Sequence, residues 1–132
     1  MATRPRTPLP SESAEQAAVI DWAHAMCQRF PCLALLYASQ AGARVSWKQA
    51  KRLKAEGMQR GIPDLHLPVA RNGSHGLWIE MKRRRGSLVS PRQRWWHDAL
   101  RLHGHQVVVA KGAEHAIAIL FAYVSDEASR VA

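Results

Sequence analysis

Apolar residues recur at helical spacing in the first part of the chain. Ser13 and Gln16 have the spacing of a capping box, and apolar side chains then return every three or four positions, at Val19, Trp22, Ala23, Met26 and Phe30. This pattern predicts a helix from Ser13 to about Arg29, because Pro31 follows. The apolar run CLALLYAS, residues 32–39, predicts a buried strand.

A second helix is predicted from Ser46 to about Glu56, where Gly57 ends it. The surface of this helix is strongly basic, with Lys48, Lys51, Arg52 and Lys54.

Two short strands joined by a hairpin turn follow. The strands are PDLHLPV, residues 63–69, and LWIEMKR, residues 77–83, and RNGSHG between them supplies the asparagine and glycines of a tight turn. Alternate residues of a strand face opposite sides of the sheet. Glu80 and Lys82 therefore share one face, and the other face holds Leu77, Ile79 and Met81.

The last third of the chain completes an alternating order of helices and strands. Ser90 is a predicted N-cap with Pro91 at the first helical position, and the helix ends at Gly104. QVVVA, residues 106–110, predicts a strand, and residues 113–124 a closing helix. The order α β α β β α β α predicts an α/β fold in which helices flank a small mixed central sheet.

Composition divides the chain into one domain and two short ends. Residues 1–12 carry three prolines and two arginines, which predicts a flexible basic arm. Residues 13–125 form the predicted domain and residues 126–132 a C-terminal tail. A length of 132 residues suits one ordinary domain.

The charge balance favours a polyanionic partner. Lys and Arg total 19 against 10 for Asp and Glu, and the net charge of +9 favours nucleic acid first and an anionic membrane second. No apolar run approaches the roughly 18 to 20 residues of a spanning helix, and no signal-peptide pattern is present. We therefore expect a cytoplasmic protein with no membrane partner. Cys27 and Cys32 are expected to be reduced thiols, since they form neither a disulfide framework nor a CxxC pair.

The triplet Glu80-Met81-Lys82 places a carboxylate and an ammonium on one strand face. Taken alone, it is more often a surface ion pair worth about a few tenths of a kcal/mol. Here Asp64 follows Pro63 on the preceding strand, and Gln93 lies on the following helix. This combination favours a catalytic site.

Three segments carry a family resemblance: GIPDLHLP, LWIEMKRRRGSLVSPRQRWW and GHQVVVAKGAEHAIAIL. They resemble the VRR-NUC domain family, a compact branch of the PD-(D/E)XK nuclease superfamily, in its stand-alone bacterial or phage type. The resemblance runs from about Glu15 to Val124. It implies a restriction-endonuclease-like core and an enzyme of a bacterial cell or a phage-infected host.

Matched by motif, the resemblance also implies the site residues. Asp64 and Glu80 would hold a divalent metal together with the backbone carbonyl of Met81, and Lys82 would serve the attacking water. Gln93 would complete the site, and Glu15 matches a helical glutamate that acts on the metal directly or through water.

The chemistry of these residues agrees with that assignment. Carboxylates packed together resist ionising unless a cation lies among them, and Mg²⁺ or Mn²⁺ prefers oxygen ligands. No small-molecule cofactor is required. Two residues keep alternative roles: Glu15 could stabilise a helix N-terminus, and Gln93 lies at the third helical position, where it could close a capping box.

The basic residues near the motif are candidate phosphate contacts: Arg83, Arg84, Arg85, Arg92 and Arg94, with Lys48, Lys51, Arg52 and Lys54 of the second helix. The alternative is an ordinary solvated basic surface. Trp47, Trp78 and Trp95 are candidates for base stacking or a dimer surface, or for buried packing, and Trp96 for the core.

Histidine spacing disfavours zinc, because the seven histidines form no HxxxH or HExxH motif. His66 points to the same side as Asp64, where it could contact substrate or occupy a half-buried polar position.

The sequence thus predicts a Mg²⁺- or Mn²⁺-dependent endodeoxyribonuclease. Because sequence-reading elements are absent, the resemblance favours structure-selective cleavage of four-way junctions or flaps in DNA repair, recombination or phage replication, by a homodimer. The alternatives are a non-catalytic basic DNA-binding module and a sequence-specific restriction-type nuclease.

Overall fold

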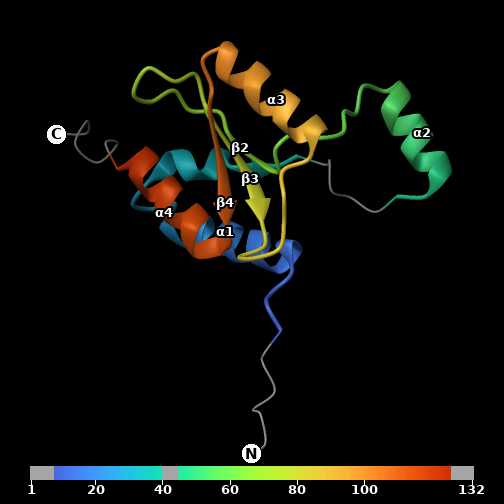
Figure 1. Cartoon of the computed structure of the whole chain (residues 1–132). Coiled ribbons are helices and arrows are strands. Elements are labelled where there is room, and N and C mark those ends of the chain that lie inside the picture. The colour runs from blue at the N-terminus through green and yellow to red at the C-terminus, as the bar shows by residue number, and fades with distance from the viewer. Residues whose placement is uncertain (1–7, 40–44, 126–132) are drawn as a thin grey trace, which may run out of the picture.

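The fold is an α/β sandwich built on a four-stranded sheet (Figure 1). The computed structural model describes residues 8–39 and 45–125. Its elements in chain order are α1 (Glu12–Met26), the 3-10 helix η1 (Pro31–Leu35), β1 (Tyr37–Ala38), α2 (Trp47–Ala55), β2 (Leu65–Leu67), β3 (Leu77–Lys82), α3 (Pro91–Leu102), β4 (Gln106–Lys111) and α4 (Ala113–Val124). The predicted small mixed sheet flanked by helices is confirmed.

The sheet has the order β1-β2-β3-β4. The pairs β1–β2 and β2–β3 are antiparallel, and β3–β4 is parallel. The predicted hairpin turn is confirmed: Asn72 and Gly73 have φ angles of 51° and 81°, the left-handed conformations that a tight two-residue turn requires. All six residues of β3 are buried, because it is a central strand covered on both faces.

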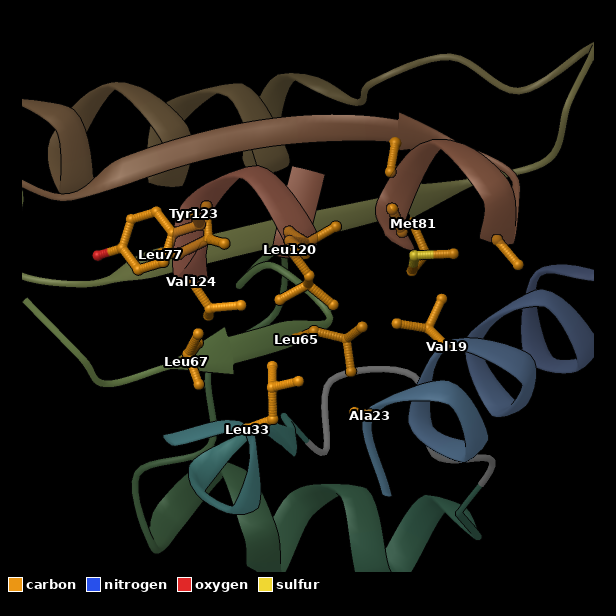
Figure 2. Packing of buried hydrophobic residues seen from close by; sticks show 14 of the residues in the cluster. Val19, Ala23, Leu33, Leu65, Leu67, Leu77, Met81, Leu120, Tyr123 and Val124 are labelled. Carbon is orange, nitrogen blue, oxygen red and sulfur yellow. The ribbon is translucent and has the colours of Figure 1, made fainter. Parts of the chain in front are cut away.

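One face of the sheet carries the hydrophobic core. Leu77, Ile79 and Met81 of β3 lie on this face and belong to one buried cluster with residues of α1 and α4. Figure 2 shows Val19 of α1 and Leu120 of α4 filling the space against the strands. Burying this apolar surface fixes which way β3 faces, and the opposite face is left for Glu80 and Lys82.

Helix α3 covers that opposite face. Its predicted start is confirmed, because Ser90 and Gln93 form a reciprocal capping box with Pro91 in the first turn. Gly104, at a φ angle of 85°, follows the end of the helix as predicted. Gln93 and His97, in the first two turns of α3, reach Lys82 and Glu80 on the polar face of β3.

Helix α2 projects from the body of the fold (Figure 1). Its predicted limits are confirmed, with a capping box at Ser46 and with Gly57 just past its end at a φ angle of 104°. α2, described throughout, buries none of its residues. The chain returning from it is fixed to α3 at Arg60, whose carbonyl oxygen accepts from Arg92 Nε at 3.1 Å and from Trp96 Nε1 at 3.0 Å.

Two predictions about the N-terminal part are wrong. Helix α1 begins at Glu12, because Ser11 rather than Ser13 is the N-cap and accepts from the Ala14 amide. The run at 32–39 is not a buried strand but the 3-10 helix η1 followed by the two exposed residues of β1. A short apolar run does not distinguish a strand from a helical turn, and here Pro31 starts a helical turn that buries Leu33.

Some sequence predictions fall outside the described residues. Residues 1–7 of the predicted arm and the predicted tail, residues 126–132, are in this group. Within residues 8–39 and 45–125, no helix has both the length and the apolar character needed to cross a bilayer.

Candidate active site

Two carboxylates meet at the polar face of the sheet. Leu65 pairs with Ile79 in antiparallel register, which places Asp64, the residue just before β2, beside Glu80 on β3. Glu80 is 1% exposed. Burial, a hydrogen bond to Asp64 and the charge of Asp64 raise the pKa of Glu80 from 4.5 to about 9. Glu80 therefore keeps a proton at neutral pH unless a cation replaces it.

Asp64 is fixed by backbone contacts on both sides. Its Oδ2 accepts from the Met81 amide at 2.7 Å, and its carbonyl oxygen accepts from the Ser39 amide at 2.8 Å. Upstream, Gly61 has a φ angle of 85°, and a Cβ there would lie 2.6 Å from Arg92 Cγ. A glycine lets the chain pass close to α3 and enter β2 with Asp64 facing Glu80.

Lys82 is held at this site by Gln93. Its Nζ donates to Gln93 Oε1 at 3.0 Å, and the lysine is only 7% exposed. The same Gln93 Oε1 accepts from the backbone amide of Ser90 at 2.9 Å, while the backbone amide of Gln93 donates to Ser90 Oγ at 3.2 Å. Gln93 therefore closes the capping box of α3 and also contacts Lys82, and its role in a catalytic site stays a prediction.

His97 is a site residue that sequence reasoning missed. Its Nε2 lies 3.1 Å from Glu80 Oε1, and both side chains are buried. Burial, followed by the charge of Arg101, lowers the pKa of His97, so its imidazole is neutral at pH 7. The available signal was its spacing, because four residues after Gln93 is the same face of a helix.

The chain that carries this arrangement matches a known domain family. The VRR-NUC domain model matches residues 4–114. The chain belongs to the VRR-NUC family. A solved structure of a VRR_NUC domain protein is similar to it, with 29% identity, a TM-score of 0.76, and coverage of 90% of this chain and 92% of that chain. No curated protein matches the chain. Since VRR-NUC is a nuclease family, this domain is a DNA-processing nuclease domain.

In this VRR-NUC domain, Glu15 has two protein donors. It is buried in α1, where Arg84 Nε donates to its Oε1 at 3.0 Å and the Ala113 amide donates to its Oε2. Glu15 thus stabilises the N-terminus of α4, a helix other than its own. The metal-site role expected for it stays a prediction.

Glu12, one turn earlier on α1, affects Glu80 through its charge. Its charge contributes to raising the pKa of Glu80, after the larger effects of burial and Asp64. Glu12 Oε1 accepts from Ser87 Oγ at 3.1 Å. The sequence prediction placed Glu12 in the arm, because it started the helix at Ser13. Among the described residues, no three histidine, cysteine or acidic side chains cluster closely enough to hold a metal ion.

An aromatic row continues the same sheet face beyond the two acids. The His66 ring stacks on Trp78 at 3.7 Å between centroids, and Tyr37 Oη lies 2.8 Å from His66 Nδ1. Burial and the nearby His105 lower the pKa of His66 to about 4. Trp78 is buried, which favours packing over base stacking for this tryptophan. Its packing against His66 extends the rigid support of the site.

The other predicted tryptophan positions divide by exposure. Trp47 is 78% exposed and Trp95 is 59% exposed, so both stay candidates for contacts with a partner. Trp96 is half-buried and donates to the carbonyl of Arg60.

The basic residues form two groups around the site. Arg83, Arg84 and Arg85 are exposed just after β3. The exposed cations of α2 are Lys48, Lys51, Arg52 and Lys54. On α3, Arg94 is exposed, while Arg92 donates to Gln59 Oε1 at 3.0 Å as well as to Arg60. Arg92 therefore fixes the chain returning from α2, and contact with DNA stays a prediction for all of these residues.

Proposed function

We propose that this domain is a Mg²⁺- or Mn²⁺-dependent endonuclease that hydrolyses DNA phosphodiester bonds. The observation that carries the proposal is the contact between half-buried Asp64 and buried Glu80, which raises the pKa of Glu80 to about 9 together with burial. A divalent cation bound to oxygen ligands would let both carboxylates ionise. Asp64 and Glu80 would hold it, together with the Met81 carbonyl, and Glu15 is the candidate for a water-mediated contact.

The bound ion would supply Lewis acidity to the scissile phosphate and would lower the pKa of a coordinated water. The protein's own part is to fix the ligands and a second positive charge. The Met81 amide donates to Asp64 Oδ2 and so orients this carboxylate. Lys82 keeps its ammonium near Glu80 through Gln93, so that it can orient the attacking water or stabilise charge that develops on the phosphate.

The exposed cations support a DNA path on the α2 side and beside Arg83 to Arg85. Phosphate contacts of this kind position a duplex without reading its sequence. With the VRR-NUC family as context, we propose structure-selective cleavage of four-way junctions or flaps, in repair, recombination or phage replication in the cytoplasm. Two opposed cuts at a junction would require a two-fold homodimer.

The experiment compares matched linear duplex, flap and four-way junction DNA, each with Mg²⁺, Mn²⁺ or EDTA. We expect cuts only with a metal ion, and faster cuts on branched DNA. Binding without scission under every condition would instead indicate a DNA-binding module. Cuts at one sequence in the linear duplex would indicate a restriction-type nuclease. Light scattering at the assay concentration tests whether the protein is a dimer. A monomer that cuts junctions symmetrically at this concentration would exclude the homodimer.

A further inference from the structure

The contact between His97 and Glu80 joins two buried polar groups on different elements. His97 lies on α3 and is 3% exposed, and its Nε2 is 3.1 Å from Glu80 Oε1 on β3. A buried polar group without a partner is costly, so each group satisfies the other. The contact uses one oxygen of Glu80.

The spacing of α3 matches the spacing of β3. Gln93 and His97 are four residues apart on a helix, a rise of about 6 Å. Glu80 and Lys82 are two residues apart on a strand, a rise of about 6.6 Å. Gln93 therefore reaches Lys82 while His97 reaches Glu80. One face of α3 supports both functional residues of β3.

The direction of the His97 hydrogen bond follows from the role proposed for Glu80. A Glu80 that binds a cation is a carboxylate, and a carboxylate oxygen can only accept. Nε2 of His97, 3.1 Å from Oε1, must then donate, so the imidazole carries its hydrogen on Nε2.

We propose that His97 is a positioning residue that holds Glu80 for the divalent cation. Its Nε2–H occupies Oε1 and thereby fixes the orientation in which Oε2 faces the ion. The inference rests on the proposed nuclease site, because it concerns a ligand of that site. Partners of this kind typically change metal affinity about 10- to 100-fold when they are removed.

The test measures Mn²⁺ binding by calorimetry, without DNA. His97→Gln keeps an N–H donor near the Nε2 position, and His97→Leu removes it. His103→Leu is the matched control, because it makes the same change at an exposed histidine at the end of α3. We expect His97→Leu to weaken Mn²⁺ binding about 10- to 100-fold. His97→Gln should stay within about threefold of the wild type, and the control should be unchanged.

Two outcomes separate this inference from the proposed function. If His97→Leu folds and binds Mn²⁺ as the wild type does, while Glu80→Gln does not bind, His97 is not a positioning residue. If Glu80→Gln binds Mn²⁺ like the wild type, the metal site itself is elsewhere. If His97→Leu does not fold, ¹⁵N NMR of the wild-type histidines decides the question. An Nε2–H tautomer at His97 in the presence of Mg²⁺ supports the proposal, and an Nδ1–H tautomer overturns it.

Discussion

Glu80→Gln should change how the stability of the metal-free domain depends on pH. The pKa of Glu80 is raised to about 9 in the folded protein from 4.5, so between these values the native state holds one proton more than the unfolded chain. Stability is then lost as pH rises toward the folded pKa. Gln is an uncharged isostere of the protonated acid. Its amide can donate to Asp64 and its carbonyl can accept from His97, so the variant should not lose stability in this way.

The magnitude follows from one proton. Within this window, each pH unit lowers the free energy of unfolding by about 1.4 kcal/mol. Between pH 7.0 and 8.5 the wild type should therefore lose about 2 kcal/mol of stability that Glu80→Gln keeps. The pKa values of His66 and His97 are both lowered, by burial first. These histidines therefore affect stability mainly below neutral pH, and their contribution is common to both proteins.

Urea unfolding after EDTA treatment measures this difference. With a urea m value of about 1.5 kcal/mol/M, the wild-type midpoint should fall by about 1.3 M between the two pH values, relative to Glu80→Gln. Mg²⁺ should reverse the loss in the wild type alone. If the unfolding midpoints of the two proteins shifted by the same amount between pH 7.0 and 8.5, a buried, protonated Glu80 would be refuted.

Three further substitutions test other parts of the structure. Gly61→Ala should lower the free energy of unfolding in urea by about 1 to 3 kcal/mol, and by more than Gly86→Ala does. Both glycines have a positive φ angle, but of the two only a Cβ at Gly61 meets other atoms within 4 Å, so equal losses would contradict the packing against Arg92. Arg84→Ala should lower the free energy of unfolding by about 1 to 3 kcal/mol, because buried Glu15 loses a charged donor, while Arg83→Ala should change it by no more than about 0.5 kcal/mol. An Arg84→Ala variant as stable as the wild type would show that Glu15 does not need its partner. Changing Lys48, Lys51 and Lys54 together to Gln should weaken DNA binding and reduce the magnitude of the slope of log K for DNA binding against log salt concentration by about 2 to 3. An unchanged slope would place α2 off the DNA path.

The sequence predicted the parts of the site that depend on local patterns. Strand alternation placed Glu80 and Lys82 on one face. The helix start predicted at Ser46 and the N-cap predicted at Ser90 both agree with the structure, which has a capping box at each. These signals are local, because a strand side chain or an N-cap is determined within a few residues.

The residues that were missed depend on tertiary packing or on a misplaced boundary. The spacing of His97 from Gln93 places both residues on one face of α3, but the contact with Glu80 also requires that this face packs across β3, which no local pattern shows. Glu12 was excluded by placing the helix start two residues beyond its true N-cap at Ser11. The buried strand predicted at 32–39 was wrong because a short apolar segment fits both a strand and a helical turn.

Single-turnover cleavage of a labelled four-way junction, compared between Lys82→Met and Lys111→Met, tests the central claim most directly. Lys111 pairs with Lys82 across β3 and β4 but is exposed, so it is a matched control. The account predicts cleavage by the wild type and Lys111→Met only with Mg²⁺ or Mn²⁺, and a rate at least about 100-fold lower for Lys82→Met. Cleavage by Lys82→Met at the wild-type rate, or cleavage by the wild type in EDTA, would contradict it.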